Sequence, residues 1–184
     1  MAEPFPLRVA YRARQFWLAL QAGPSPADLG EARSLLSPAQ MELFMRMQPE
    51  EQVHSLGVLR RLRLQGERQP DLLAAALLHD AGKSRLPLSV WERVWIVLVG
   101  ALAPGSLRRW GDQPYQEGQR LPAWQRPLVA ARQHADWGAE LAEQAGASPL
   151  AVALIRRHQQ KVVLTDSNLE DGLLSKLQAV DDQN

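Results

Sequence analysis

Residues 70–83, PDLLAAALLHDAGK, decide how this chain folds. A proline followed by an acid is typical of a first helical turn, and every residue from 72 to 78 is apolar. A helix that is apolar on all sides is buried in a core. The sequence therefore predicts a central buried helix over residues 72–79, which ends on an imidazole, His79, followed by a carboxylate, Asp80.

The segments on both sides of this stretch also have a helical pattern, and proline and glycine separate them. No strand-like alternation persists anywhere, so we expect an all-α fold. Residues 111–126 contain two glycines and two prolines and are expected to form an irregular loop. The predicted helices cover 7–22, 39–47, 49–65 closed by Gly66, 87–103, 127–145 capped by Gly146, a helix from Ser148-Pro149 that carries His158, and a helix opened by the capping-box pattern Ser167–Glu170 that runs to Asp181.

A chain of 184 residues fits one domain with a sizeable core. We expect an N-terminal helical extension over residues 1–48 and the main domain over residues 49–184. Apolar residues make up 46% and charged residues 22%, which is typical of a globular protein. The net charge of +1 argues against nucleic acid as a partner. The longest uncharged apolar run, residues 94–104, is too short to cross a membrane.

Cysteine is absent, which excludes disulfides, thiolate metal sites and cysteine nucleophiles. The first residues lack the pattern of a signal peptide. We therefore expect a cytoplasmic protein without a membrane partner.

All four histidines of the chain lie on apolar helix faces. For example, the residues three, four and seven positions before His79 are two alanines and a leucine. A single inward histidine is typically a hydrogen-bonded core residue, but two carboxylates share the same pattern, and a buried carboxylate needs a partner. Imidazole and carboxylate groups together are ligands of divalent metals. The predicted ligands are His54, His79, Asp80, His134, His158 and Asp181.

Two other carboxylates compete for these roles. Asp182 follows a more polar helix face than Asp181 does, so Asp181 is the preferred ligand. Asp136 lies beside His134 in the sequence and is expected to face solvent.

The ordered ligand set resembles the HD superfamily of metal-dependent phosphohydrolases over about residues 50–184. Residues 74–83, AAALLHDAGK, are similar to the central helix end of that family, with its His-Asp pair, glycine and lysine. The stretches around His134 and His158 resemble the two extra histidines of cyclic-dinucleotide phosphodiesterase branches. The gaps are nearly regular: 25 residues from His54 to His79, 24 from His134 to His158, and 23 on to Asp181.

The resemblance implies a single HD-domain-like helical bundle in which His54, His79, Asp80 and Asp181 hold one metal ion. His134 and His158 would hold a second ion, with Asp80 as the bridge. Such a site activates water and clamps phosphate oxygens, so the implied activity is hydrolysis of a phosphoester, with a nucleotide or cyclic nucleotide as the expected substrate. Asp80 and Lys83 are the predicted catalytic residues, and Lys83 with Arg85 would contact the substrate phosphate. One or two ions are expected, and Fe, Mn, Zn, Ni, Co and Mg remain open.

Several features depart from the family pattern. No Gly-Tyr-Pro follows His158, which argues against cyclic-di-GMP as the substrate, and Arg157 stands where many relatives have a second histidine. The segment between residues 85 and 132 is longer than in compact members. Its four tryptophans could line a nucleobase pocket or pack a lid, although ordinary packing is the favoured interpretation: Trp91, Trp95, Trp110 and Trp124.

Three functional hypotheses therefore stay open. The favoured one is a phosphohydrolase. The second is a catalytically silent HD-domain module that senses a nucleotide and has a regulatory role. The third is a nucleic-acid binder that uses the many arginines, which the net charge argues against. Phe16, Trp17, Phe44 and Met45 could serve a homo-oligomer or cover the domain.

Overall fold

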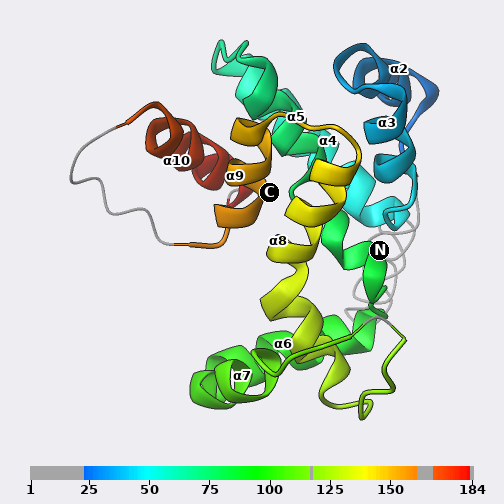
Figure 1. Ribbon diagram of the computed structural model, residues 1–184, viewed down its shortest axis with the longest axis vertical. Coiled ribbons are helices and arrows are strands. Elements are labelled where there is room, and N and C mark those ends of the chain that lie inside the picture. The colour runs from blue at the N-terminus through cyan, green and yellow to red at the C-terminus, as the bar shows by residue number, and fades with distance from the viewer. Residues whose placement is uncertain (1–22, 117, 161–167, 183–184) are drawn as a thin grey trace, which may run out of the picture.

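The computed structural model describes residues 23–116, 118–160 and 168–182. These residues contain nine α-helices, one short 3-10 helix and no strand, which confirms the all-α prediction (Figure 1). The helices are α2 (Pro26–Leu35), α3 (Pro38–Met45), α4 (Pro49–Leu64), α5 (Pro70–Leu78), η1 (Ala81–Arg85), α6 (Val90–Leu102), α7 (Pro104–Gly111), α8 (Arg126–Gln144), α9 (Pro149–Arg157) and α10 (Leu169–Asp181).

Capping side chains set where these helices begin. Ser25, Ser37 and Ser89 each accept a hydrogen bond from a backbone N–H in the first turn, within complete capping boxes that open α2, α3 and α6. Two glycines with positive φ, Gly66 and Gly146, follow the ends of α4 and α8. Glycine adopts this left-handed conformation without steric cost, so both predicted helix ends are confirmed.

Some helix boundaries differ from the sequence predictions. Helices α2 and α7 were not predicted, because prolines were interpreted as separators between helices, although Pro26 and Pro104 occupy first turns. Helix α6 begins at Val90 and not at residue 87, since Ser89 provides its cap. Asn168 caps α10 by accepting a bond from the Asp171 amide. The helix predicted over residues 7–22 lies outside the described residues.

Helix α5 lies at the centre of the main core, as its composition predicts. All its residues from Leu72 to Leu78 are buried, and they pack with residues of α4, α9 and α10. Complete burial of one leucine side chain contributes about 1.5–3 kcal/mol. Helices α2 and α3 add Ala32 and Phe44 to the same core and lie beside α4 and α5 in Figure 1. The described part of the predicted N-terminal extension therefore shares one core with α4, α5, α9 and α10.

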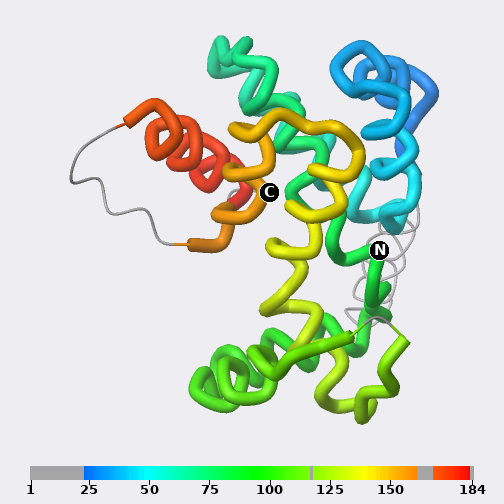
Figure 2. The backbone as a smooth tube through the Cα atoms, in the orientation of Figure 1, coloured from blue at the N-terminus to red at the C-terminus, as the bar shows by residue number. Residues whose placement is uncertain are grey.

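Helix α8 connects this core to the α6–α7 pair, as the tube in Figure 2 shows. Its face toward η1 and α6 carries a second apolar cluster that includes Val129 and Trp137. Contact with η1 is very close, because a Cβ on Gly82 would lie 1.9 Å from the carbonyl oxygen of His134. Glycine at this position therefore allows the segment after Asp80 to lie directly against α8.

Every helix among the described residues is too short or too polar to span a lipid bilayer.

Candidate metal centre

The six side chains predicted as metal ligands meet in the interior of the helical bundle. They form two triads, and within each the ligand atoms lie within 4.8 Å of one another. His54 comes from α4, His134 from α8 and Asp181 from the last residue of α10, whereas His79 and His158 directly follow α5 and α9. The first triad is His54, His79 and Asp181, and the second is Asp80, His134 and His158. Either triad could hold a metal ion.

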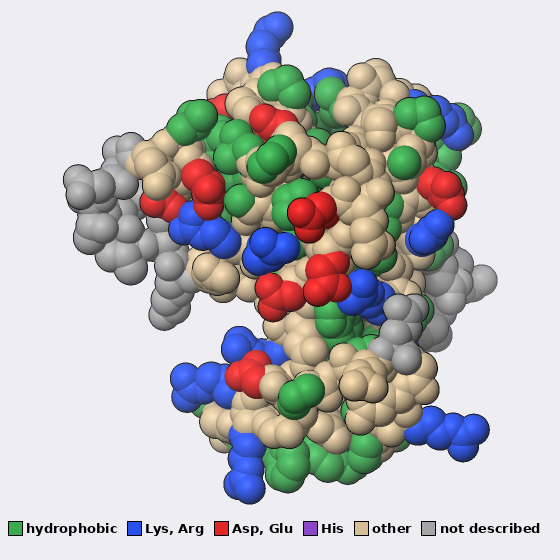
Figure 3. Space-filling model, viewed as in Figure 1, with side chains coloured by type: hydrophobic (Ala, Val, Ile, Leu, Met, Phe, Trp, Pro, Cys, Tyr) green, Lys and Arg blue, Asp and Glu red, His purple; other side chains and the backbone are tan. Residues whose placement is uncertain are grey.

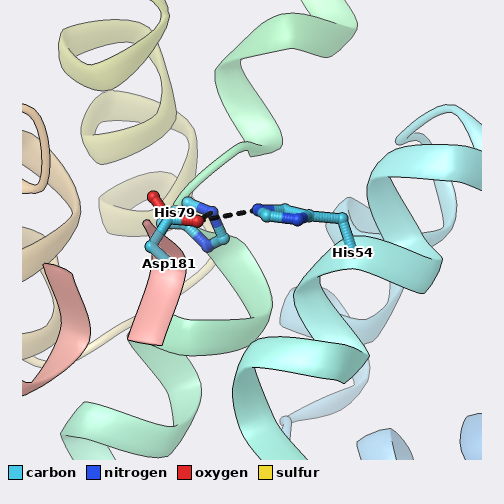
Figure 4. Close-up of side chains that lie close together, drawn as sticks. All are labelled: His54, His79 and Asp181. Atoms are coloured by element: carbon cyan, nitrogen blue, oxygen red, sulfur yellow. Dashed lines mark hydrogen bonds and ion pairs between the residues drawn. The ribbon is translucent and has the colours of Figure 1, made fainter. Parts of the chain in front are cut away.

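The first triad centres on the carboxylate of Asp181, against which both imidazole rings lie (Figure 4). The Oδ1 atom of Asp181 lies 2.8 Å from Nε2 of His54 and 3.4 Å from Nε2 of His79. A metal ion that binds ligands at about 2.1 Å separates neighbouring ligand atoms by about 3 Å. The spacing of the first triad is therefore close to that of a coordination sphere.

The second triad is more deeply buried. The Oδ1 atom of Asp80 lies 3.3 Å from Nε2 of His134 and 4.0 Å from Nε2 of His158. The two Nε2 atoms of His134 and His158 are 3.3 Å apart. All three residues are at most 5% exposed, so this triad has nitrogen and oxygen ligands but little contact with water.

Asp80 belongs to the second triad but also faces the first, because its two carboxylate oxygens point in different directions. While Oδ1 faces His134 and His158, the Oδ2 atom lies 3.5 Å from Nε2 of His79 and 3.9 Å from Nε2 of His54. A carboxylate in this position can bridge two cations. The geometry is therefore compatible with the bridging role that the family resemblance implies for Asp80.

Backbone carbonyls fix the protonation of three of these rings. Nδ1 of His79, His134 and His158 lies 3.0, 3.0 and 2.7 Å from the carbonyl oxygens of Ala76, Ala130 and Ile155. Since a carbonyl can only accept, each Nδ1 must carry the hydrogen, and Nε2 of a neutral ring then has a free lone pair.

These lone pairs point into the two triads. Nε2 of His79 is buried and has no hydrogen-bond partner. Buried polar atoms are normally paired, so an unpaired nitrogen that faces two carboxylates fits a metal ligand.

The surrounding charges favour the ionisation states in which these residues bind metals. Burial would raise the pKa of Asp80, but the positive charges of Lys83 and His79 and a hydrogen bond from His134 hold it well below its usual range. Burial would also raise the pKa of Asp181, but a hydrogen bond from His54 and the positive charge of His79, 3.4 Å away, hold it below its usual range. Both groups are therefore carboxylates at neutral pH.

His158 and His79 differ in the direction of their pKa shift. Burial together with the nearby His79 and His134 lowers the pKa of His158 to about 3, so this ring is neutral at pH 7. For His79, burial acts in the same direction, but Asp80 and Asp181 outweigh it and raise the pKa to about 9. A proton and a metal ion would therefore compete for Nε2 of His79.

Lys83 lies beside the centre, as the sequence predicts, and has two acidic partners. Its Nζ is 2.7 Å from Oδ2 of Asp80 and 3.2 Å from Oε2 of Glu51. Glu51 is only 4% exposed and also accepts a hydrogen bond from Arg93 at 2.5 Å. Neither Glu51 nor Arg93 was among the predicted site residues. Glu51 could have been found, because it precedes His54 by three positions on the same helix face.

Arg85, the second residue predicted to contact substrate, points elsewhere. Its guanidinium pairs with Glu140 of α8 at 2.8 Å and lies 6.0 Å from the ring centre of Trp137. Lys83 and Arg85 are two positions apart on a 3-10 helix of three residues per turn, so they project in different directions. The structure brings Lys83 to the centre and places Arg85 against α8.

Neither rival carboxylate belongs to a triad, although Asp182 lines a cavity together with His158 and Asp181. Asp182 is exposed, while Asp181 faces the first triad. Asp136 is largely exposed, as predicted, with Arg156 at 4.0 Å. The preference for Asp181 over Asp182 is therefore consistent with the geometry.

Two cavities adjoin the centre from different directions. The first, of about 540 Å³, is lined by His54, Asp80 and Lys83 together with α6. The second, of about 510 Å³, is lined by His158, Asp181 and a group of polar side chains. None of the four tryptophans of residues 85–132 is among the described lining residues of either cavity, which agrees with the favoured interpretation of ordinary packing. Trp95 donates to the Trp124 carbonyl, and the Trp124 ring packs edge-on against Trp110.

Comparisons with family models, with curated proteins and with solved structures gave no match. The geometry of the centre and the sequence motifs are therefore the observations from which a function can be inferred.

Proposed function

We propose that this protein is a metal-dependent phosphohydrolase of the HD type. The observation that carries the proposal is the pair of triads joined by Asp80, in which three imidazoles are oriented by backbone carbonyls. The ordered motif with His54, His79-Asp80, His134, His158 and Asp181 supports it further. Two adjacent sites that share a carboxylate suit chemistry on a phosphate group, because both the attacking and leaving oxygens need stabilisation.

Each residue of the centre has a distinct role in this proposal. Divalent cations, when bound, supply Lewis acidity that activates water and neutralises phosphate charge. Asp80 would bridge the two sites, with the imidazoles and Asp181 completing them. Lys83 would contact a phosphate oxygen of the substrate, since its Nζ lies at the rim of the first cavity. Glu51 would position Lys83 by holding its ammonium group.

The reaction assigned by this proposal is hydrolysis of a phosphoester bond. The test uses the purified protein. Its metal content is measured by elemental analysis, and its hydrolytic activity is measured with bis(4-nitrophenyl) phosphate and with a panel of nucleotides. We expect at least one transition metal per chain and turnover that a chelator abolishes. Asp80→Ala should abolish turnover, and Asp136→Ala, which changes an exposed aspartate of α8, should leave it unchanged.

Other outcomes would contradict the proposal. Normal turnover in a folded Asp80→Ala variant would rule out this centre as the active site. Tight binding of a nucleotide without hydrolysis of any ester would instead favour a catalytically silent, regulatory module.

A further inference from the structure

The first cavity has a polar end and an apolar wall. His54, Asp80 and Lys83 form the polar end, beside the first triad. The apolar wall is formed by four aliphatic side chains of α6, Val90, Val94, Val97 and Leu98, and the charged Arg93 of the same helix also lines the cavity. A ligand whose phosphate lies at the triads would therefore extend its organic group along α6.

The wall is continuous because of the helical period. The other three residues follow Val90 by four, seven and eight positions, which places all four on one face of α6. The capping box of Ser89 and Glu92 fixes the start of the helix, and Arg126 of α8 pairs with Glu92 at 2.5 Å. Much of the wall is open to solvent, since Val94, Val97 and Leu98 are 42%, 69% and 47% exposed. In Figure 3 apolar side chains gather at the end of the molecule formed by α6 and α7.

The polar side chains at the rim are engaged with one another. Glu51 bonds both Lys83 and Arg93, and Arg93 also pairs with Glu50 at 3.1 Å. Recognition of a nucleobase needs hydrogen-bonding groups or an aromatic face on the wall. Apart from the His54 imidazole at the polar end, the described lining residues contain no aromatic side chain, and four of the five that come from α6 are aliphatic.

We propose that the organic group of the substrate held in this cavity is an aliphatic chain, packed against α6. This inference rests on the proposed phosphohydrolase function and narrows its substrate to phosphoesters with an extended saturated or unsaturated hydrocarbon group. Aliphatic walls bind such a group by the hydrophobic effect, and each added methylene strengthens binding.

The second cavity provides the competing outcome. Its lining includes Arg132, Gln159, Gln160 and Gln178 next to His158. A polar group such as a nucleoside would suit these side chains better than the aliphatic wall. A substrate preference for polar esters would therefore point to this second approach to the centre.

The test compares the hydrolysis of two phosphodiesters that share a 4-nitrophenyl leaving group. The second ester group is methyl in one and hexyl in the other. Nucleotides are assayed under the same conditions. The metal-loaded full-length protein should hydrolyse the hexyl ester with at least about tenfold higher kcat/KM, because five additional methylenes can be buried. Leu98→Ser should remove this preference. Leu102→Ser changes the same residue type one turn further along α6, at a side chain that is 82% exposed, and should retain it. Circular dichroism and melting temperature confirm that both variants fold.

A binding experiment separates this inference from the proposed function. Calorimetry with hexylphosphonate and methylphosphonate should show at least about tenfold tighter binding of the longer ligand, and Leu98→Ser should abolish the difference. If this binding occurs but no ester is hydrolysed, the aliphatic ligand is supported and the enzymatic proposal fails. Equal kcat/KM for both esters, equal effects of the two substitutions, or a preference for nucleotides would overturn the inference.

Discussion

Gly82 and His134 approach so closely that a Cβ on Gly82 would lie 1.9 Å from the His134 carbonyl oxygen. The same Cβ would lie 2.5 Å from the amide nitrogen of Gly138. Both atoms belong to the backbone of α8, so a rotamer change cannot relieve the contact. The glycine two positions after Asp80 therefore sets how closely the segment that follows Asp80 approaches α8, the helix that carries His134.

The first prediction concerns this contact. Gly82→Ala should destabilise the fold by about 2–4 kcal/mol and reduce metal binding, because η1 must move away from α8. Gly172→Ala is the control, since its Cβ would meet nothing within 4 Å in the middle of α10. That variant should be more stable by about 0.4–1 kcal/mol. Chemical denaturation measures both, and equal stability of the two variants would contradict the close packing.

The second prediction compares neighbouring aspartates. Asp181→Asn should lower the metal content, because Asp181 contacts both histidines of the first triad. Asp182→Asn should retain the content of the parent protein. Metal at about 100 times Kd adds about 2.7 kcal/mol of stability, which for this chain length raises Tm by about 5–10 °C. A chelator should remove that increase from the parent and from Asp182→Asn. If the Asp181→Asn variant retains the metal content of the parent protein, Asp181 is not a ligand.

The third prediction concerns Lys83 and its acidic partner. Lys83→Ala should reduce kcat/KM by about 10- to 100-fold while metal content is retained, because a charge that faces phosphate is lost. Glu51→Gln should lower kcat by a smaller factor, since it positions the ammonium group without touching substrate. Lys176→Ala is the control, as Lys176 pairs with Glu67 on the surface. Equal activity of the Lys83→Ala and Lys176→Ala variants would place Lys83 outside the reaction.

The fourth prediction concerns pH. Because Asp80 and Asp181 raise the pKa of His79 above its usual 6.5 to about 9, the ring carries a proton at neutral pH that a metal must displace. Metal affinity should therefore increase as pH rises toward 9, by about tenfold per unit for one displaced proton. In chelated protein this proton stabilises the fold below pH 6.5, and its contribution is lost as pH rises through 9.

Calorimetric zinc titrations of the parent at pH 6.5 and 8.5, in two buffers that differ in ionisation enthalpy, measure both the affinity and the released proton. Asp182→Asn, which keeps the ligand set, should follow the parent. An affinity that is constant between these two pH values would contradict the competition.

Local patterns predict most of the helices because they act over a few residues. The apolar run 72–78 and the glycines 66 and 146 specify a buried helix and two helix ends without reference to the rest of the chain. Prolines are harder to interpret, because a proline can follow the end of one helix or occupy the first turn of the next. Pro26 and Pro104 stand in first turns, and the capping residue Ser25 was the available signal for α2.

The predicted ligands could be named from the sequence because each lies on an apolar helix face, and the structure brings all six together. Their surroundings depend on long-range packing. Arg85 lies against α8 because of the direction in which a 3-10 turn projects it, and the aliphatic wall of α6 faces the centre through contacts between segments far apart in the chain. Neither relationship has a short-range signal. The proposed phosphohydrolase activity stays a prediction until turnover is measured.

The carbonyl bonds to three imidazoles have a consequence for metal choice. Each ring is held by a carbonyl three or four residues earlier in its own helix, so its direction is established when the bundle folds. An arriving ion meets ligands that have little freedom to adjust. Selection among divalent metals would then follow ionic radius and preferred coordination angle, and a substitution that shifts α5, α8 or α9 would change which element the protein retains.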